Sequence, residues 1–241
     1  MLHYDQPIKM IKVFRKIRQN LLSQGKTGKY LKYAIGEIIL VVLGILIALS
    51  INNWNQSRKQ NIAEKDFLEG IKTDLKKDKE YINLVIQLHK PKIEVFDLLN
   101  KGLPKLYNEN QIAVDSLFKI YFTSQRTFYP ISGSFQSAVS GNEINSYKDK
   151  VISSSLIKLY NTTYVRLIDN GKISDDRWDY LSRKYSHERR IGINQNMSDS
   201  HLSELLDDMY HHFVHMRWYQ NQLIDTNREI DEILEKIYRG Q

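Results

Sequence analysis

The sequence predicts an all-α protein with one transmembrane helix, a helical-bundle domain and a long C-terminal heptad helix. Three observations support this fold class: an apolar run near the N-terminus, helical spacing of apolar residues along the remainder, and no run of strand-like alternation. We divide the 241 residues into a basic arm (1–32), a transmembrane helix (33–54) and a helical domain (55–241).

The basic arm accounts for the whole formal net charge of +7. Acidic and basic residues balance over the rest of the chain, so we expect no nucleic-acid partner, because a nucleic-acid binder carries its excess charge on the folded domain. Between Met10 and Leu22, apolar residues recur at helical spacing with Arg15, Lys16 and Arg18 interleaved. This pattern predicts an amphipathic helix that anchors on an anionic membrane surface, or alternatively one that docks a cytoplasmic partner.

The apolar run from Tyr33 to Ile51 is long enough to cross a bilayer, at about 28 Å of helix. Tyr33 and Trp54 stand at its two ends, as interfacial aromatic residues do. Because the basic residues precede the span, we expect a cytoplasmic N-terminus and a periplasmic domain anchored in a bacterial inner membrane. The competing interpretation is a cleaved signal peptide, which the long preceding arm disfavours.

Two features inside the span are candidate functional positions. Glu37 is its only charge, and lies about one turn from the N-terminal end, where a carboxylate can reach the headgroups. We expect an anchoring role, with a proton or partner role as the alternative. Gly44 and Ala48 form a small-xxx-small pair that is compatible with helix association.

The segment from Met10 to Asn55 contains four further motifs in fixed register. They are Met10-Ile11-Lys12 with Phe14-Arg15-Lys16-Ile17-Arg18, Tyr33-Ala34-Ile35-Gly36-Glu37-Ile38, Gly44-Ile45-Leu46-Ile47-Ala48 and Asn52-Asn53-Trp54-Asn55. In these residues the chain resembles an uncharacterised family of single-pass inner-membrane proteins found mainly in Bacteroidota. The resemblance implies a helical periplasmic part and no known activity. It also leaves open whether translation starts at Met1 or at Met10, where the family usually begins.

Apolar spacing predicts several helices beyond the span. We expect one from Phe67 to Leu99 that ends or kinks near His89 because of Pro91, and others over residues 111–121, 134–140 and 151–168. A further helix is expected to begin at Ser174, with Asp175 and Asp176 in its first turn.

Between two of these helices, residues 123–133 form the least regular stretch of the domain. Its residues Arg126, Phe128 and Tyr129 are our candidate contacts for a ligand or partner, because loops often carry binding sites. The alternative is a connector whose aromatic residues pack on the bundle.

The last helix carries the clearest pattern of the domain, in which apolar residues alternate steps of four and three over five heptads. Gln220 and Asn227 are its polar members, and such residues often fix register or oligomeric state. The seam indicates either the long arm of an intramolecular bundle or a dimeric coiled coil. Its members are Leu202, Leu206, Met209, Phe213, Met216, Gln220, Leu223, Asn227, Ile230, Leu234 and Ile237.

Known chemical motifs are missing from the sequence. It has no cysteine, which excludes disulfides and thiolate chemistry, and it has no phosphate loop, nucleophile elbow or zinc-protease motif. His211, His212 and His215 share one helix, but the heptad frame turns His211 and His215 towards solvent, so we expect no bound metal. We therefore assign no cofactor and no catalytic residue.

These observations favour a membrane-anchored interaction or sensing module that acts as an adaptor or accessory subunit. We expect a protein partner or self-association, and leave the question of a small-molecule ligand open. The alternatives are a cell-envelope enzyme with an unfamiliar site and a structural homo-oligomer held by the C-terminal helix.

Overall fold

The computed structural model describes residues 15–16, 19, 27–193 and 197–240. Helices dominate these residues and no strand occurs among them, which confirms the all-α prediction. The chain divides into two compact units, residues 1–61 and 62–241, and each is described by itself.

The first unit consists mainly of the N-terminal part of helix α2, which runs from Thr27 to Glu109. Side chains between Ile38 and Ile51 are exposed, with values such as 69% for Leu40 and 60% for Ile47. A continuous exposed apolar surface of this length is a candidate membrane span. Arg15 and Lys16 are helical and exposed, whereas Arg18 and most of the basic amphipathic helix lie outside the described residues.

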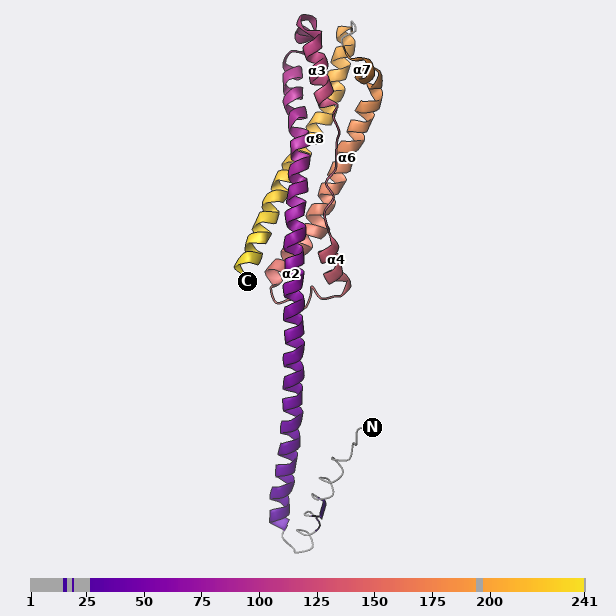
Figure 1. Cartoon of the computed structure of the whole chain (residues 1–241). Coiled ribbons are helices and arrows are strands. Elements are labelled where there is room, and N and C mark those ends of the chain that lie inside the picture. Colours follow the sequence, from indigo (N-terminus) through magenta and orange to yellow (C-terminus); the bar gives the residue numbers. More distant parts are fainter. Residues whose placement is uncertain (1–14, 17–18, 20–26, 194–196, 241) are drawn as a thin grey trace, which may run out of the picture. The chain divides into compact units, whose positions relative to one another are not determined.

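The second unit is a bundle in which the rest of α2 lies beside α6 and α8 (Figure 1). Short helices complete it, with α3 and α7 near one end of the bundle and α4 near the other. Their bounds are α3 Gln111–Tyr121, α4 Gly133–Ser140, α5 Lys150–Lys158, the π-helix η1 Leu159–Thr163, α6 Tyr164–Lys184, α7 Ser186–Ile191 and α8 Asp199–Arg239.

Two of the predicted helix boundaries are wrong. Helix α2 does not end near His89, since it continues through Pro91 and departs from helical geometry only at Gly102. Proline removes a single backbone hydrogen bond, and buried side chains on both sides of Pro91 hold the helix together. Ser174 does not start a helix either, because it lies in the middle of α6, so Asp175 and Asp176 do not occupy a first turn.

The predicted C-terminal heptad helix is present as α8, and its seam faces the domain interior. Most seam residues are buried, and the ring of Phe213 stacks on Phe96 of α2 with centroids 4.2 Å apart. The polar members also reach α2: Gln220 donates to the carbonyl oxygen of Ile86 at 3.3 Å, and Asn227 donates to the Oδ1 of Asn83 at 2.7 Å. In this structure the seam therefore packs within the chain.

The apolar interior of the bundle forms two separate clusters. Along α2 one cluster extends up to Val85 and the other begins at Val95. Along α6 the corresponding limits are Leu167 and Leu181. The buried polar residues His89 and Lys92 of α2 and Ser174 of α6 lie between these limits.

Candidate functional site

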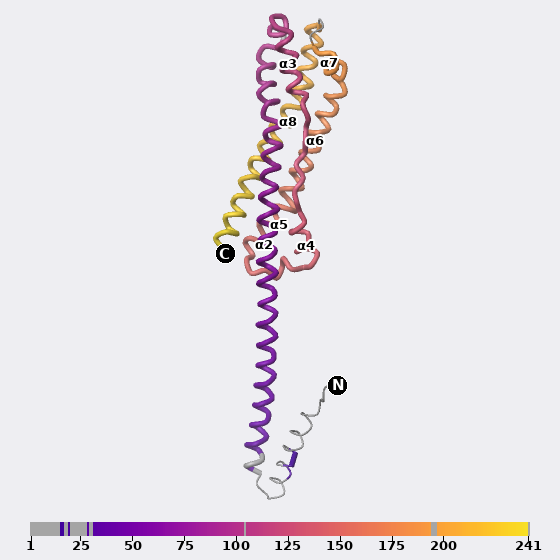
Figure 2. Tube along the Cα trace, in the orientation of Figure 1, coloured from indigo at the N-terminus to yellow at the C-terminus, as the bar shows by residue number. Residues whose placement is uncertain are grey.

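A long irregular connection (residues 123–132, the connecting segment) joins α3 to α4 and runs lengthwise along the bundle (Figure 2). Its backbone makes no helix or strand, so its buried N–H and C=O groups need partners from elsewhere. Side chains of the surrounding helices supply them. Tyr81 donates to the Thr127 oxygen, Tyr160 donates to the Ile131 oxygen, and the N–H groups of Phe128 and Ile131 donate to Tyr219 and Asp78.

Near its start the connecting segment is held by Lys92, whose side chain is fully buried. Lys92 Nζ donates to the carbonyl oxygen of Thr123 at 2.8 Å and to Oε1 of Gln125 at 3.2 Å, and it lies 5.4 Å from the centre of the Trp178 ring. Burial lowers the pKa of Lys92 to about 7, with Asp175 opposing the shift. A lysine charge inside a bundle is costly, and here its hydrogen bonds fix the connecting segment.

Two histidines lie in the same part of the bundle, and both are buried. His89 makes no hydrogen bond within the described part of the chain. His212 Nδ1 lies 2.8 Å from the hydroxyl of Tyr121, while its Nε2 has no partner there. Burial lowers the pKa of each histidine to about 3, with a further contribution from Lys92, so both rings are neutral at ordinary pH.

Helix α6 completes this region from the other side of the connecting segment. Thr127 Oγ1 donates to Asp175 Oδ2 at 2.6 Å, and Gln125 donates to Ser174 Oγ at 2.9 Å. Gly171 permits this approach, because a Cβ there would lie 2.5 Å from Thr127 Cγ2 and 2.8 Å from the Tyr219 hydroxyl. We call the resulting group the polar layer; its members are His89, Lys92, Gln125, Ser174, Asp175, Trp178 and His212.

Towards its other end the connecting segment is held by Asp78 of α2. Its carboxylate accepts from the N–H of Ile131 at 2.8 Å and from the hydroxyl of Tyr164 at 2.7 Å. Burial raises the pKa of Asp78 to about 6, although both hydrogen bonds act in the opposite direction.

Comparison with known proteins assigns the chain to one protein family. A family model described as "Family of unknown function (DUF6090)" matches residues 37–227, most of the chain. The chain belongs to this family. No curated protein and no solved structure matches it. The match begins inside the candidate span and ends in α8, so the DUF6090 unit includes both the polar layer and the connecting segment.

The three candidate contact residues of the connecting segment, Arg126, Phe128 and Tyr129, differ in burial. Phe128 is fully buried, with its ring against Tyr81 and Tyr164. Arg126 and Tyr129 are exposed on the surface of the bundle, Tyr129 by 52%. The segment thus packs into the bundle through Phe128 and exposes the side chains of Arg126 and Tyr129.

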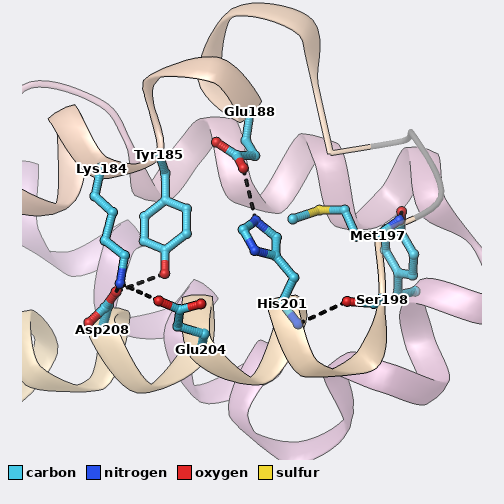
Figure 3. Close-up of polar contacts among 9 residues, drawn as sticks. Lys184, Tyr185, Glu188, Met197, Ser198, His201, Glu204 and Asp208 are labelled. Atoms are coloured by element: carbon cyan, nitrogen blue, oxygen red, sulfur yellow. Dashed lines mark hydrogen bonds and ion pairs between the residues drawn. The ribbon is translucent and has the colours of Figure 1, made fainter.

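A second polar network ties the turn between α6 and α7 to the start of α8 (Figure 3). Lys184 Nζ lies 2.6 Å from both Glu204 Oε1 and Asp208 Oδ2, and the hydroxyl of Tyr185 donates to the same Asp208 oxygen at 2.7 Å. His201 Nε2 lies 2.9 Å from Glu188 Oε1. The Lys184 ammonium group pairs with the Glu204 and Asp208 carboxylates and so links the end of α6 to α8.

The described residues contain no group of three or more potential metal ligands. His211 is exposed, whereas His215 Nε2 lies 3.1 Å from the backbone oxygen of Asn170. His212 is buried in the bundle instead. The seam did not reveal this, because it uses only two positions of each heptad and His212 occupies another.

The positions of the buried polar residues follow a pattern in the sequence. A search for apolar spacing does not detect it, because the residues at these positions are polar. The buried face of α2 also follows steps of four and three, and Asp78, His89 and Lys92 take three of its places. On α8 a third buried position recurs every seven residues beside the seam, and includes His212 and Tyr219. At three of these positions, Asp78, Lys92 and Tyr219, the side chain binds the backbone of the connecting segment.

The remaining candidate positions lie in the first unit. Tyr33 and Trp54 are exposed by 42% and 65%, and the guanidinium of Arg58 lies 6.0 Å from the Trp54 ring centre. Glu37 is half-buried and has contacts of its own. Gly44 and Ala48 are exposed, and a Cβ added at Gly44 would meet no atom within 4 Å.

Proposed function

We propose that the protein is a membrane-anchored interaction or sensing module that works as an adaptor or accessory subunit. In this proposal it sits in a bacterial inner membrane with its N-terminus in the cytoplasm and its helical domain in the periplasm. The observation that supports it best is the exposed apolar surface from Ile38 to Ile51. Such a surface is unfavourable in water, and a bilayer would cover it.

The surface of the second unit offers places for a protein partner. Tyr210, Val214 and Trp218 stand four residues apart on α8 and are exposed by 55%, 45% and 46%. Arg126 and Tyr129 of the connecting segment are exposed as well. Aromatic residues and arginine are enriched where proteins bind one another, so these positions are the first to vary.

The proposal is tested by purifying the tagged full-length protein from its native membranes in mild detergent and identifying co-purifying proteins by mass spectrometry. We expect one dominant partner at near-equal stoichiometry. Its recovery should fall at least about tenfold with Trp218→Ser plus Val214→Ser or with Arg126→Glu plus Tyr129→Ser, since central aromatic contacts contribute most to binding. The matched control is Tyr180→Ser, an exposed aromatic residue on a different helix, α6.

Other results of the same purification would favour the alternatives. A self-associated protein without a second component would favour the structural homo-oligomer. In that case the contact would have to use surfaces other than the seam, because the seam is buried against α2. A folded, solitary monomer would contradict the adaptor function and favour a search for substrates of an envelope enzyme.

The orientation is tested separately by fusing alkaline phosphatase after Arg239. We expect an active fusion, because the enzyme matures only outside the cytoplasm. Replacing Arg15 and Lys16 with glutamate should lower the active fraction, since positive residues hold the N-terminal flank inside. An inactive fusion at normal expression level would contradict the proposed topology.

A further inference from the structure

The polar layer brings three basic side chains together inside the bundle. His89, Lys92 and His212 are exposed by only 0%, 0% and 1%. They are close enough to influence one another, because Lys92 contributes to the lowered pKa of both histidines, and His89 contributes to that of His212. Three groups that can each gain a positive charge thus share one section of the core.

None of the three has an acidic hydrogen-bond partner within the described part of the chain. Lys92 is bound by neutral oxygens of Thr123 and Gln125. His212 meets the hydroxyl of Tyr121, which also donates to the backbone oxygen of Met209, and His89 makes no hydrogen bond at all. A proton added to either histidine would therefore create a buried charge without a counter-ion.

The other charged groups around the layer are mostly basic. Arg189 of α7 lowers the pKa of Lys92, and Arg177 of α6 and His215 of α8 lower that of His212. Among the described residues, Asp175 of α6 is the acid that acts on Lys92, and it already accepts from Thr127. Tyr219, whose ring lies 5.8 Å from His89, brings no charge to offset these bases.

We infer that the polar layer is an acid-sensitive joint, which opens and releases the start of the connecting segment when its buried bases take up protons. The apolar side chains of the two clusters on either side take up no proton in acid and should stay packed. This inference goes beyond the proposed function, since it concerns the domain itself and holds whatever partner it binds.

The direction of the three pKa shifts determines whether the domain gains or loses stability in acid. The histidine pKa values in the folded domain, about 3, lie below the ordinary value of 6.5, so their contribution to stability is complete above pH 6.5 and is lost as the pH falls towards 3. The pKa of Lys92 is lowered from 10.5 to about 7, so its contribution falls as the pH drops through that range and is fully lost below 7. All three bases therefore favour opening in acid.

Asp78 at the other end of the connecting segment works in the opposite direction. Its pKa is raised to about 6, and Tyr160 and Tyr164 face it together with Asp74, while Glu229 of α8 acts on Tyr164. Protonation of Asp78 in acid relieves a buried charge and stabilises that end. Opening is therefore expected at residues 123–127, next to Lys92, before it reaches Ile131.

The test is hydrogen–deuterium exchange of the full-length protein in detergent at pH 7.5 and pH 5, corrected for the intrinsic pH dependence of amide exchange. One pKa unit corresponds to a tenfold change, so we expect the opening constant of peptides covering residues 85–96 and 123–127 to rise at least about 100-fold at pH 5. Peptides containing Ile71 or Leu75 should change much less.

The decisive variant is the double substitution His89→Gln and His212→Gln, which keeps polar side chains that do not titrate. We expect its increase at pH 5 to be less than about tenfold. The matched control, His187→Gln plus His211→Gln at two exposed positions, should behave like the wild type. If the double variant does not fold, His212→Gln alone should remove about half of the effect on a logarithmic scale.

A local reporter within the layer provides a second readout. With Trp54 and Trp218 replaced by phenylalanine, Trp178 is the sole tryptophan, and its ring lies near Lys92 and Arg189. We expect its fluorescence to change as the pH falls from 6.5 towards 3, and the change to disappear in the His89→Gln, His212→Gln background. Unchanged exchange between pH 7.5 and 5, or an equal response of wild type and double variant, would overturn the inference.

Discussion

The two apolar clusters of the bundle and the polar layer between them hold the same helices together by different means. In the clusters, α2, α6 and α8 bury aliphatic and aromatic side chains whose contribution does not depend on ionisation. In the polar layer, the helices bind an irregular segment through lysine, aspartate and hydroxyl groups. Different interactions therefore stabilise the two kinds of region, and only those in the polar layer involve groups that ionise. Substitutions in the two kinds of region should be distinguishable by how their effect on stability depends on pH.

The largest expected effect comes from an apolar cluster. Leu75→Ala removes a fully buried side chain and should lower the free energy of unfolding by about 2–5 kcal/mol, because a cavity remains. The loss should be the same at pH 7.5 and pH 5.5, as measured by urea denaturation followed by circular dichroism. Leu84→Ala, on the same helix but 46% exposed, should cost no more than about 0.5 kcal/mol. A strongly pH-dependent loss at Leu75 would remove the distinction between the two kinds of region.

Asp78→Asn should change the pH dependence itself. The pKa of Asp78 is raised from 3.8 to about 6, so its stabilising contribution is present below pH 3.8 and is lost as the pH rises through 6. Asparagine does not titrate, and the variant should therefore gain about 2 kcal/mol on the wild type between pH 4 and pH 7. Unfolding curves at several pH values measure this gain. Parallel curves for both proteins would contradict the buried carboxylate, and exposed Asp97→Asn serves as the control.

Gly171→Ala tests how closely the connecting segment approaches α6. Alanine normally stabilises a helix interior by about 1 kcal/mol relative to glycine. Here its Cβ would collide with Thr127 and with the hydroxyl of Tyr219, so we expect a net loss of about 1–3 kcal/mol. Gly133→Ala, where a Cβ meets no atom within 4 Å, should be neutral or slightly stabilising. Thermal unfolding of both variants checks the difference in sign.

The same comparison explains which parts of the fold could be predicted from the sequence. The α8 seam and the helix from Gln111 to Tyr121 were predicted because apolar spacing reports directly on which face is buried. The boundaries expected at Pro91 and Ser174 were wrong because packing on both sides of each residue overrides the local helix signals. No local pattern shows that residues 123–132 run through the bundle, since their burial depends on Lys92, Asp175 and Tyr219 far away in sequence.

The smallest effect, and the most local one, is expected from Tyr219→Phe. The hydroxyl of Tyr219 accepts from the N–H of Phe128 at 2.9 Å, and phenylalanine would leave this buried donor without a partner, at a cost of about 1–2 kcal/mol. The ring remains to fill the cluster, so the amide of Phe128 should exchange faster while amides near Ile230 on α8 stay protected. Tyr210→Phe, at an exposed position of α8, should leave both unchanged. If Phe128 kept its protection in the Tyr219 variant, the connecting segment would be held by the packing of its side chains rather than by side-chain hydrogen bonds to its backbone.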